Sequence, residues 1–243
     1  MHKITIILFS AILFLNGCTI IGEEQFPTKE IKDIKAVELK PTDSIAFEDY
    51  VKKDLENING YDWWSTLHFK KLTKFTLTTS ASSTLNNSDL YKSANLCDGK
   101  AETAWVEGVK GNGIGEWIKI AIDAYSSFSE VTTTPFSIFE IAILPGYAKS
   151  QKTWVENNRV KKLQVIIHSP SPSYPKENEW IAFQLDLKDK NDLQVFKIPN
   201  DKTPVNFDPM KHEIWLRIMD VYKGTKYDDT CISEFVAVGG FTN

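Results

Sequence analysis

The chain of 243 residues carries 28 lysines and arginines against 32 aspartates and glutamates, which gives a formal net charge of −4. Domains that grip nucleic-acid phosphates usually show a basic excess or a basic stripe. The acidic balance of this chain therefore disfavours nucleic-acid binding.

The first residues have the organisation of an export signal. A basic start at Lys3 is followed by a largely apolar run over residues 4–15 and a small residue before Cys18. The run is well below the roughly 20 residues that a bilayer-spanning helix needs. We therefore predict a cleaved signal peptide over residues 1–17 and not a transmembrane anchor.

Residues 15–18, Leu-Asn-Gly-Cys, resemble the lipobox of bacterial lipoproteins. The resemblance implies fatty acyl chains, such as palmitate, on Cys18 and on its new amino group. Two or more acyl chains give stable anchoring where one gives marginal binding. The alternative is an ordinary secretory signal with a chance cysteine. Thr19 is not the aspartate of the inner-membrane retention signal, which favours the outer membrane or cell surface.

Residues 18–42 are polar with few large apolar residues, which predicts a lipidated cysteine followed by a flexible tether. Residues 43–71 form a lead-in to the main domain, and apolar residues recur at helical spacing in its first half, ahead of Gly60. One short amphipathic helix is expected there. Trp63 and Trp64 follow it, either as a surface patch or as packing between the helix and the main domain.

From Leu72 onward the apolar pattern changes to a period of two residues, which is typical of half-buried strands. Ile118 and Ile120, for example, alternate with Trp117 and Lys119. Two packed sheets would bury such stripes, so residues 72–243 are predicted to form one all-β sandwich domain. The expected strands lie at residues 75–79, 116–123, 136–144, 160–168, 180–187, 193–198, 213–219 and 231–238.

Patterns that would indicate catalysis are weak. The glycine-rich run of residues 108–115 leads into a strand, whereas a phosphate-binding loop leads into a helix. His68, His168 and His212 are too far apart for metal-ligand spacing, and no serine stands in a nucleophile-elbow sequence. The adjacent Asp228 and Asp229 are typical of a turn. The sequence therefore predicts a protein that is not an enzyme.

Residues 95–105, Asn-Leu-Cys-Asp-Gly-Lys-Ala-Glu-Thr-Ala-Trp, resemble the signature loop of the discoidin, or coagulation factor type C, superfamily. With residues 145–147, 157–163 and 227–234, they resemble its NAD glycohydrolase-associated branch, a glycan-binding or translocation domain. The resemblance covers about residues 72–243. It implies a jelly-roll β-sandwich with a galactose-binding-like fold.

Glu234 shares a strand face with Ile232 and Val236, and an unpaired carboxylate on a buried face is costly. In the superfamily, the signature loop and a glutamate near the chain end hold a structural calcium. The resemblance thus implies a calcium site at Asp98, Thr103 and Glu234, and six to eight oxygens suit that ion. Alternatively, Glu234 pairs with a lysine or accepts hydrogen bonds from the loop.

The same docking would bring Cys97 near Cys231. An exported protein meets an oxidising milieu, so a disulfide between them is one interpretation. Two buried thiols that act as small apolar residues are the other.

Binding is expected at the matched loops, where aromatic and charged side chains suit a sugar: an aromatic face covers the apolar side of a pyranose, and polar groups serve its hydroxyls. A core position for Trp105 and a salt bridge for Arg159 or Lys149 are the alternatives. We expect a membrane-anchored binder of glycans or cell-envelope polysaccharide, or else an assembly or translocation module that holds a partner protein. The candidate ligand-binding residues are Trp105, Glu107, Tyr147, Lys149, Arg159, Lys226, Tyr227 and Asp228.

Overall fold

The computed structural model describes residues 24–56, 63–65, 76–123, 136–168, 180–202, 205–206 and 211–241. The expected signal peptide, Cys18 and His68 lie outside the described residues. Within these ranges, the helices are too short or too polar to span a membrane.

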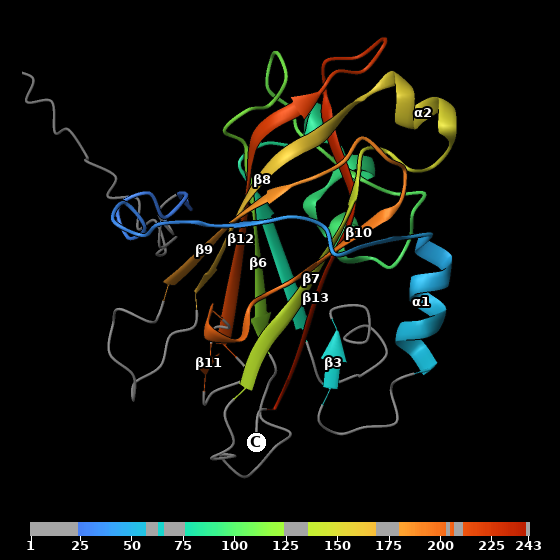
Figure 1. Cartoon of the computed structure of the whole chain (residues 1–243). Coiled ribbons are helices and arrows are strands. Elements are labelled where there is room, and N and C mark those ends of the chain that lie inside the picture. The colour runs from blue at the N-terminus through green and yellow to red at the C-terminus, as the bar shows by residue number, and fades with distance from the viewer. Residues whose placement is uncertain are drawn as a thin grey trace, which may run out of the picture.

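Strands dominate the described residues, and only two α-helices accompany them there (Figure 1). The elements are β1 (Val37–Leu39), β2 (Asp43–Ile45), α1 (Phe47–Glu56), β3 (Trp63–Ser65), β4 (Thr76–Ala81), β5 (Trp105–Val106), β6 (Trp117–Asp123), β7 (Phe136–Pro145), α2 (Gln151–Glu156), β8 (Asn158–His168), β9 (Trp180–Asp186), β10 (Leu193–Lys197), β11 (Val205–Asn206), β12 (Lys211–Tyr222) and β13 (Thr230–Phe241).

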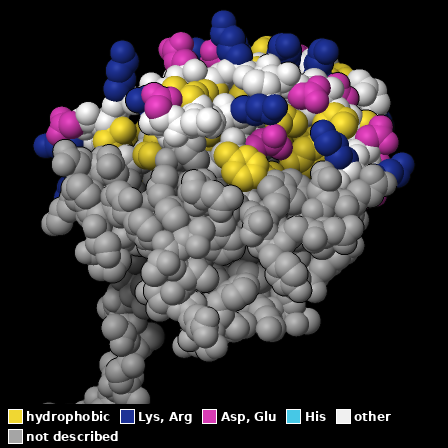
Figure 2. Space-filling model, turned by 60° about the horizontal axis from the view of Figure 1, so that its bottom comes forward, with side chains coloured by type: hydrophobic (Ala, Val, Ile, Leu, Met, Phe, Trp, Pro, Cys, Tyr) yellow, Lys and Arg dark blue, Asp and Glu magenta, His cyan; other side chains and the backbone are white. Residues whose placement is uncertain are grey.

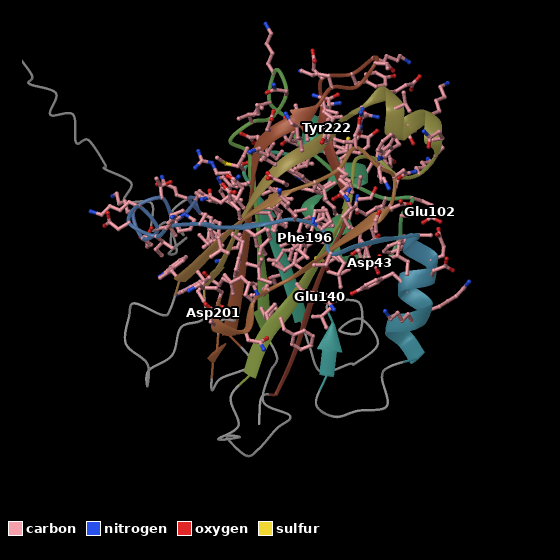
Figure 3. All side chains as sticks on the ribbon, viewed as in Figure 1. Asp43, Glu102, Glu140, Phe196, Asp201 and Tyr222 are labelled. Atoms are coloured by element: carbon pink, nitrogen blue, oxygen red, sulfur yellow. The ribbon has the colours of Figure 1, made fainter. Side chains whose placement is uncertain are left out.

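The strands form the two layers of a β-sandwich, which confirms the predicted fold class. One layer has the order β4-β6-β12-β8-β9-β1 and the other has the order β2-β10-β7-β13. A short parallel pairing of Thr230 and Cys231 in β13 with β8 joins the layers at one end. The core between the layers contains Phe196, which Figure 3 labels, and Phe235, both fully buried.

The period-two pattern places the expected side chains in this core. Ile118 and Ile120 of β6 and Leu216 of β12 are all buried. Trp215, on the opposite face of β12, is 4% exposed as well. A tryptophan on a solvent-facing side of a sheet would be largely exposed. The burial of Trp215 therefore shows that another part of the chain covers the outer face of β12.

The covering element is the N-terminal strap, which we define as residues 24–45. β1 pairs in parallel with β9, and β2 pairs antiparallel with β10. Leu39 enters the core between the layers. The prediction of a flexible tether up to Thr42 is therefore wrong from residue 24 onward. The prediction failed because the edge strands of the two layers have unpaired backbone groups. A polar segment with only a few apolar side chains can pair with them.

The predicted helix is confirmed as α1. Phe47 and Tyr50 on one of its faces are buried against Leu144 and Val195, on the outer side of the second layer. β3, which holds the two tryptophans, pairs through its backbone with Val238–Gly240 of β13. The segment before the predicted domain thus belongs to the sandwich.

Candidate functional site

We define the rim as the end of the sandwich where the loops of residues 82–91, 97–104, 107–116, 146–150 and 223–230 meet; the loops of residues 107–116 and 223–230 lie near the top of Figure 1. Most of the sequence-derived candidates lie here. Their burial and hydrogen bonds separate those that hold the rim together from those that face solvent.

A buried carboxylate fastens the signature loop to β13. Glu234 is fully buried, and its Oε2 accepts hydrogen bonds from the backbone N–H of Gly99 at 2.9 Å and of Lys100 at 3.2 Å. Asp98 Oδ1 accepts from the Lys100 N–H at 3.0 Å and from the Thr103 hydroxyl at 2.8 Å. We call these residues the Asp98–Glu234 clip. The structure thus brings together the three residues for which calcium was expected.

The donors of the clip bear on that expectation. Calcium takes six to eight oxygen ligands. In the clip, N–H and O–H groups already point at Glu234 Oε2 and Asp98 Oδ1. Among the described residues, no three His, Cys, Asp or Glu side chains gather in a way that could hold a metal ion. The clip therefore fits a closed hydrogen-bonded arrangement better than a calcium site, and calcium binding stays a prediction.

The structure has Cys97 and Cys231 as two buried thiols and not as a disulfide. Cys97 packs in the main core, as does Ile232, whereas Cys231 packs on the other side of β13 with Val106. Neighbouring side chains of a strand point to opposite faces, which separates the two sulfurs. Burial raises the pKa of the Cys231 thiol well above its ordinary value.

Glu107 was expected to contact ligand, but the structure places it in the interior with none of its surface exposed. Its carboxylate accepts from the N–H of Thr230 at 3.1 Å and of Val109 at 2.8 Å. Gly113, in a left-handed conformation with φ of 63°, lies so close that a β-carbon there would clash with the Glu107 side chain. Burial raises the pKa of Glu107. Its role is to fasten the glycine-rich loop to the start of β13.

Trp105 is also fully buried, which excludes it from ligand contact. Its Nε1 donates to the carbonyl of Ser83 at 3.0 Å, and the Ser83 hydroxyl accepts from the N–H of Gly108 at 2.9 Å. Trp105 thus packs the core and ties two rim loops together.

Arg159 is 7% exposed, and its guanidinium donates four hydrogen bonds within the chain. It forms two hydrogen bonds to Asp189, at 3.0 and 2.8 Å, and donates from Nη1 to the carbonyls of Asn157 and Lys223 at 3.1 and 3.0 Å. It also stacks 4.6 Å from the ring centre of Trp154. The structure places Arg159 in a salt bridge, which was the alternative to a ligand contact, and the surrounding loops accept four of its five N–H groups.

The remaining candidates reach solvent. Lys149, Lys226 and Asp228 are exposed, Tyr227 is 42% exposed, and Tyr147 is half-buried. Lys226 Nζ lies 4.7 Å from the centre of the Tyr227 ring. These five side chains are the part of the predicted set that a ligand can touch.

The loop that carries Tyr227 is held in place by its backbone. The N–H groups of Lys226 and Tyr227 donate to the carbonyl of Glu156 at 3.1 and 2.9 Å. Asn158, fully buried, accepts from the N–H of Gly224 at 2.7 Å and donates to the carbonyl of Asp228 at 2.5 Å. Tyr227 is therefore presented on a fixed loop.

Two residues of the rim were not among the predicted candidates. Tyr91 packs edge-to-face against Tyr147 with ring centres 6.4 Å apart. It ends a short 3₁₀ helix, Asp89–Tyr91, where the sequence has no period-two spacing that would predict a role. Asn158 lies in the motif of residues 157–163. An asparagine at the start of a strand often forms hydrogen bonds to nearby backbone groups, and this property could have predicted its role in holding the loop.

A hollow apart from the rim lies between β2, α1, β7 and β10. Asp43, Tyr50, Glu140 and Lys197 line it, and the Tyr50 hydroxyl donates to Glu140 at 3.1 Å; Figure 3 labels Asp43 and Glu140. Tyr50 is only 8% exposed, so the hollow lacks an accessible aromatic face. It suits a sugar less well than the rim.

The charges on the surface are mixed in sign. Figure 2 shows cationic and anionic side chains interspersed over the part of the forward face that the structure describes. Such a surface does not form the basic stripe that phosphate backbones require.

Two strand layers with a buried carboxylate clip at the rim define a discoidin-like sandwich. The family described as NAD glycohydrolase translocation F5/8 type C domain matches residues 68–238. This chain belongs to that family. Residues 24–56, with the strap and α1, precede the matched region.

Solved structures with similar folds include carbohydrate-related proteins. The C-terminal domain of a chitobiase from Bacteroides fragilis is 16% identical, with 70% of this chain and 97% of that chain covered and a TM-score of 0.42. The family 32 carbohydrate-binding module of Streptococcus pneumoniae EndoD is 11% identical, with coverages of 67% and 94% and a TM-score of 0.44. A Ruminococcus gnavus GH29 fucosidase is 14% identical, with coverages of 69% and 26% and a TM-score of 0.38. A search of curated proteins found no match.

Proposed function

We propose that this chain is a lipid-anchored, non-catalytic glycan-binding protein that uses the exposed side chains of its rim. The observation that carries the proposal is that the rim has two kinds of polar and aromatic residues: buried ones that hold the loops and exposed ones that can contact a ligand. Glu107, Arg159 and Glu234 are buried and hold the loops. Tyr227 and Lys226 remain exposed on a loop that backbone hydrogen bonds fix.

This arrangement suits sugar recognition. The face of Tyr227 can cover the apolar side of a pyranose ring, while Lys149, Lys226 and Asp228 can exchange hydrogen bonds with its hydroxyls. A loop that is already ordered loses little conformational entropy on binding, which favours a shallow site. Binding then requires no covalent chemistry from the protein.

A glycan array tests the proposal. The mature chain with Cys18→Ala, soluble because it cannot be acylated, is compared with the same chain carrying Tyr227→Ala. We expect the substitution to lower the array signal at least tenfold without changing the melting temperature. Lys40→Ala, at an exposed position of the strap, is the matched control. No signal from the parent chain on any glycan would contradict the proposal.

A second candidate function is a module that holds a partner protein at the same rim. Leu90, Val109 and Ile114 are 72%, 39% and 53% exposed. Gly108 lies against the backbone of Thr84, so the two loops that carry these side chains are neighbours. If this function holds, Leu90→Ser with Ile114→Ser abolishes membrane recruitment of the partner, and free sugars do not compete.

Anchoring is part of the proposal. Acyl chains on Cys18 would place the mature protein on the outer membrane or cell surface. Intact mass measurement of the membrane fraction tests this: the mature chain should begin at Cys18 and carry the added mass of its acyl groups. Cys18→Ala should move the protein to the soluble fraction.

A further inference from the structure

The first described residues of the strap are tied to the outer face of the β6-β12 layer by charge. Glu24 Oε1 lies 2.7 Å from Lys119 Nζ, and the same Nζ lies 2.9 Å from Glu213 Oε1. The Lys119 side chain is only 15% exposed. Ser80 of β4 donates a further hydrogen bond to Glu24. The strap is therefore attached to the sandwich from residue 24.

Aromatic packing reinforces this attachment two residues later. The rings of Phe26 and Trp215 meet edge-to-face with centres 6.1 Å apart, and Trp117 packs on Trp215 at 5.2 Å. The guanidinium of Arg217 lies 4.9 Å from the centre of the Phe26 ring. Ile31 and other strap residues continue the contact over the same face. We call this covered surface the strap face.

The strap then clasps both layers. β1 extends the layer that contains β9, β2 extends the layer that contains β10, and only residues 40–42 separate the two strands. Leu39 fills the core between the layers at this point. The segment closes one open side of the sandwich, so it cannot swing as a unit without breaking both pairings.

The attachment point fixes how far the domain can lie from Cys18. Glu24 is six residues after Cys18, and an extended chain spans at most about 3.6 Å per residue, or ~22 Å. A tether that ran to Thr42 would reach roughly 85 Å on the same basis. The anchored end and the strap face are therefore close neighbours.

We propose that the strap mounts the sandwich on the lipid surface with the strap face toward the bilayer and the rim to one side of the covered area. This rests on the proposed acylation of Cys18. The rim lies beside the strap face, along the direction of β12: Tyr222, near the rim in Figure 3, is seven residues beyond Trp215, or ~23 Å at 3.3 Å per residue, so the membrane does not have to cover it. In this arrangement the membrane lies against the strap-covered side of the sandwich, and the rim remains accessible to its ligand.

Energy transfer from the protein to labelled lipid tests the mount. The full acylated chain is placed in vesicles of phosphatidylethanolamine and phosphatidylglycerol that contain a headgroup-labelled acceptor lipid. A donor dye is attached to Met219→Cys, on the outer face of the strap layer, or to Lys197→Cys, on the outer face of the opposite layer. Both positions are exposed, and the native Cys97 and Cys231 are buried.

We expect at least twofold stronger transfer from the Met219→Cys site than from the Lys197→Cys site. Phe26→Ala combined with Lys119→Ala should release the start of the strap and bring the two values together, whereas Lys29→Ala, an exposed strap substitution, should leave the difference intact. Equal transfer in the parent chain would overturn the mount. Hydrogen exchange of the soluble Cys18→Ala chain gives a second test. Backbone amides of the strap that exchange as fast as those of an unfolded peptide would also overturn the mount.

Failure of the anchoring and failure of the mount give different results. A chain whose intact mass shows no acyl group, and which does not float with vesicles, overturns the anchoring and with it the mount. A chain that is acylated and floats but transfers equally from both sites overturns the mount alone.

Discussion

The rim and the strap face each depend on a glutamate, and the two glutamates are stabilised in different ways. At the rim, Glu107 is buried among backbone N–H groups, and burial raises the pKa of its carboxyl. On the strap face, hydrogen bonding to His168 and then to Lys119 lowers the pKa of Glu213 to about 2.

The difference supports the proposal that the rim binds ligand and the strap face attaches the N-terminal segment. The rim is fastened by buried carboxylates and backbone groups, and Tyr227 and Lys226, which contact each other, stay exposed to solvent. On the strap face, Lys119 and Trp215 are already engaged by residues of the same chain. A surface that binds its own N-terminal segment has fewer groups to offer to others.

Removing the strap together with α1 and β3 is the largest change that this comparison predicts. A chain that begins at Lys71 lacks the buried Leu39, Phe47 and Tyr50. Loss of one such side chain alone typically costs about 2–5 kcal/mol. We therefore expect the shortened chain to be unfolded or to lose well over half of its free energy of unfolding. Urea unfolding measures this, with a chain that begins at Glu24 as the control; equal stability would show that the strap, α1 and β3 are dispensable.

Breaking the clip at the rim should have the next largest effect. Glu234→Ala leaves the Gly99 N–H without its acceptor and the Lys100 N–H with Asp98 alone, and an unsatisfied donor costs up to about 1–3 kcal/mol when buried. Asp98→Ala removes an acceptor that is more exposed, so it should cost less. Thermal unfolding of the two variants gives the comparison. A larger loss from Asp98→Ala would mean that the clip has another organising group.

The two glutamates should respond to acid in opposite directions. The folded-state pKa of Glu213 lies below its ordinary value of 4.5, so its contribution to stability is present above pH 4.5 and is lost as the pH falls toward about 2. The folded-state pKa of Glu107 is raised, so stability gains as the pH falls through that value toward 4.5.

Melting curves recorded from pH 7 to pH 2 test these signs. Glu213→Gln should flatten the loss of stability below pH 4.5, and Glu107→Gln should remove the gain on mild acidification. Glu30→Gln, at an exposed position of the strap, serves as the control. The same pH profile for all three variants and the parent would contradict the assigned causes.

Calcium should have the smallest effect. Because N–H and O–H groups already occupy Glu234 Oε2 and Asp98 Oδ1, we expect the melting temperature to stay the same with calcium or with a chelator. A ligand at 100 times its dissociation constant would add about 2.7 kcal/mol, which is easily measured. A clear rise with calcium that Glu234→Gln abolishes would establish the calcium site after all.

The sequence by itself determined the layered β architecture and the meeting of two distant segments. Alternation in β6 and β12 identifies the core side of each strand, because a sandwich must bury one face. The motif around Asp98 and the strand of Glu234 together resemble a known family, which the match over residues 68–238 bears out. Even the short helix α1 followed from its apolar spacing.

Only the tertiary structure decided which polar residues are structural and whether the N-terminal segment is free. Glu107 and Arg159 have the composition of binding residues, and their roles depend on donors and acceptors from loops distant in sequence. β1 and β2 have three residues each and gain their stability from sheet edges that they complete. Local sequence does not encode such pairing, because the energy of a short strand comes from its neighbours.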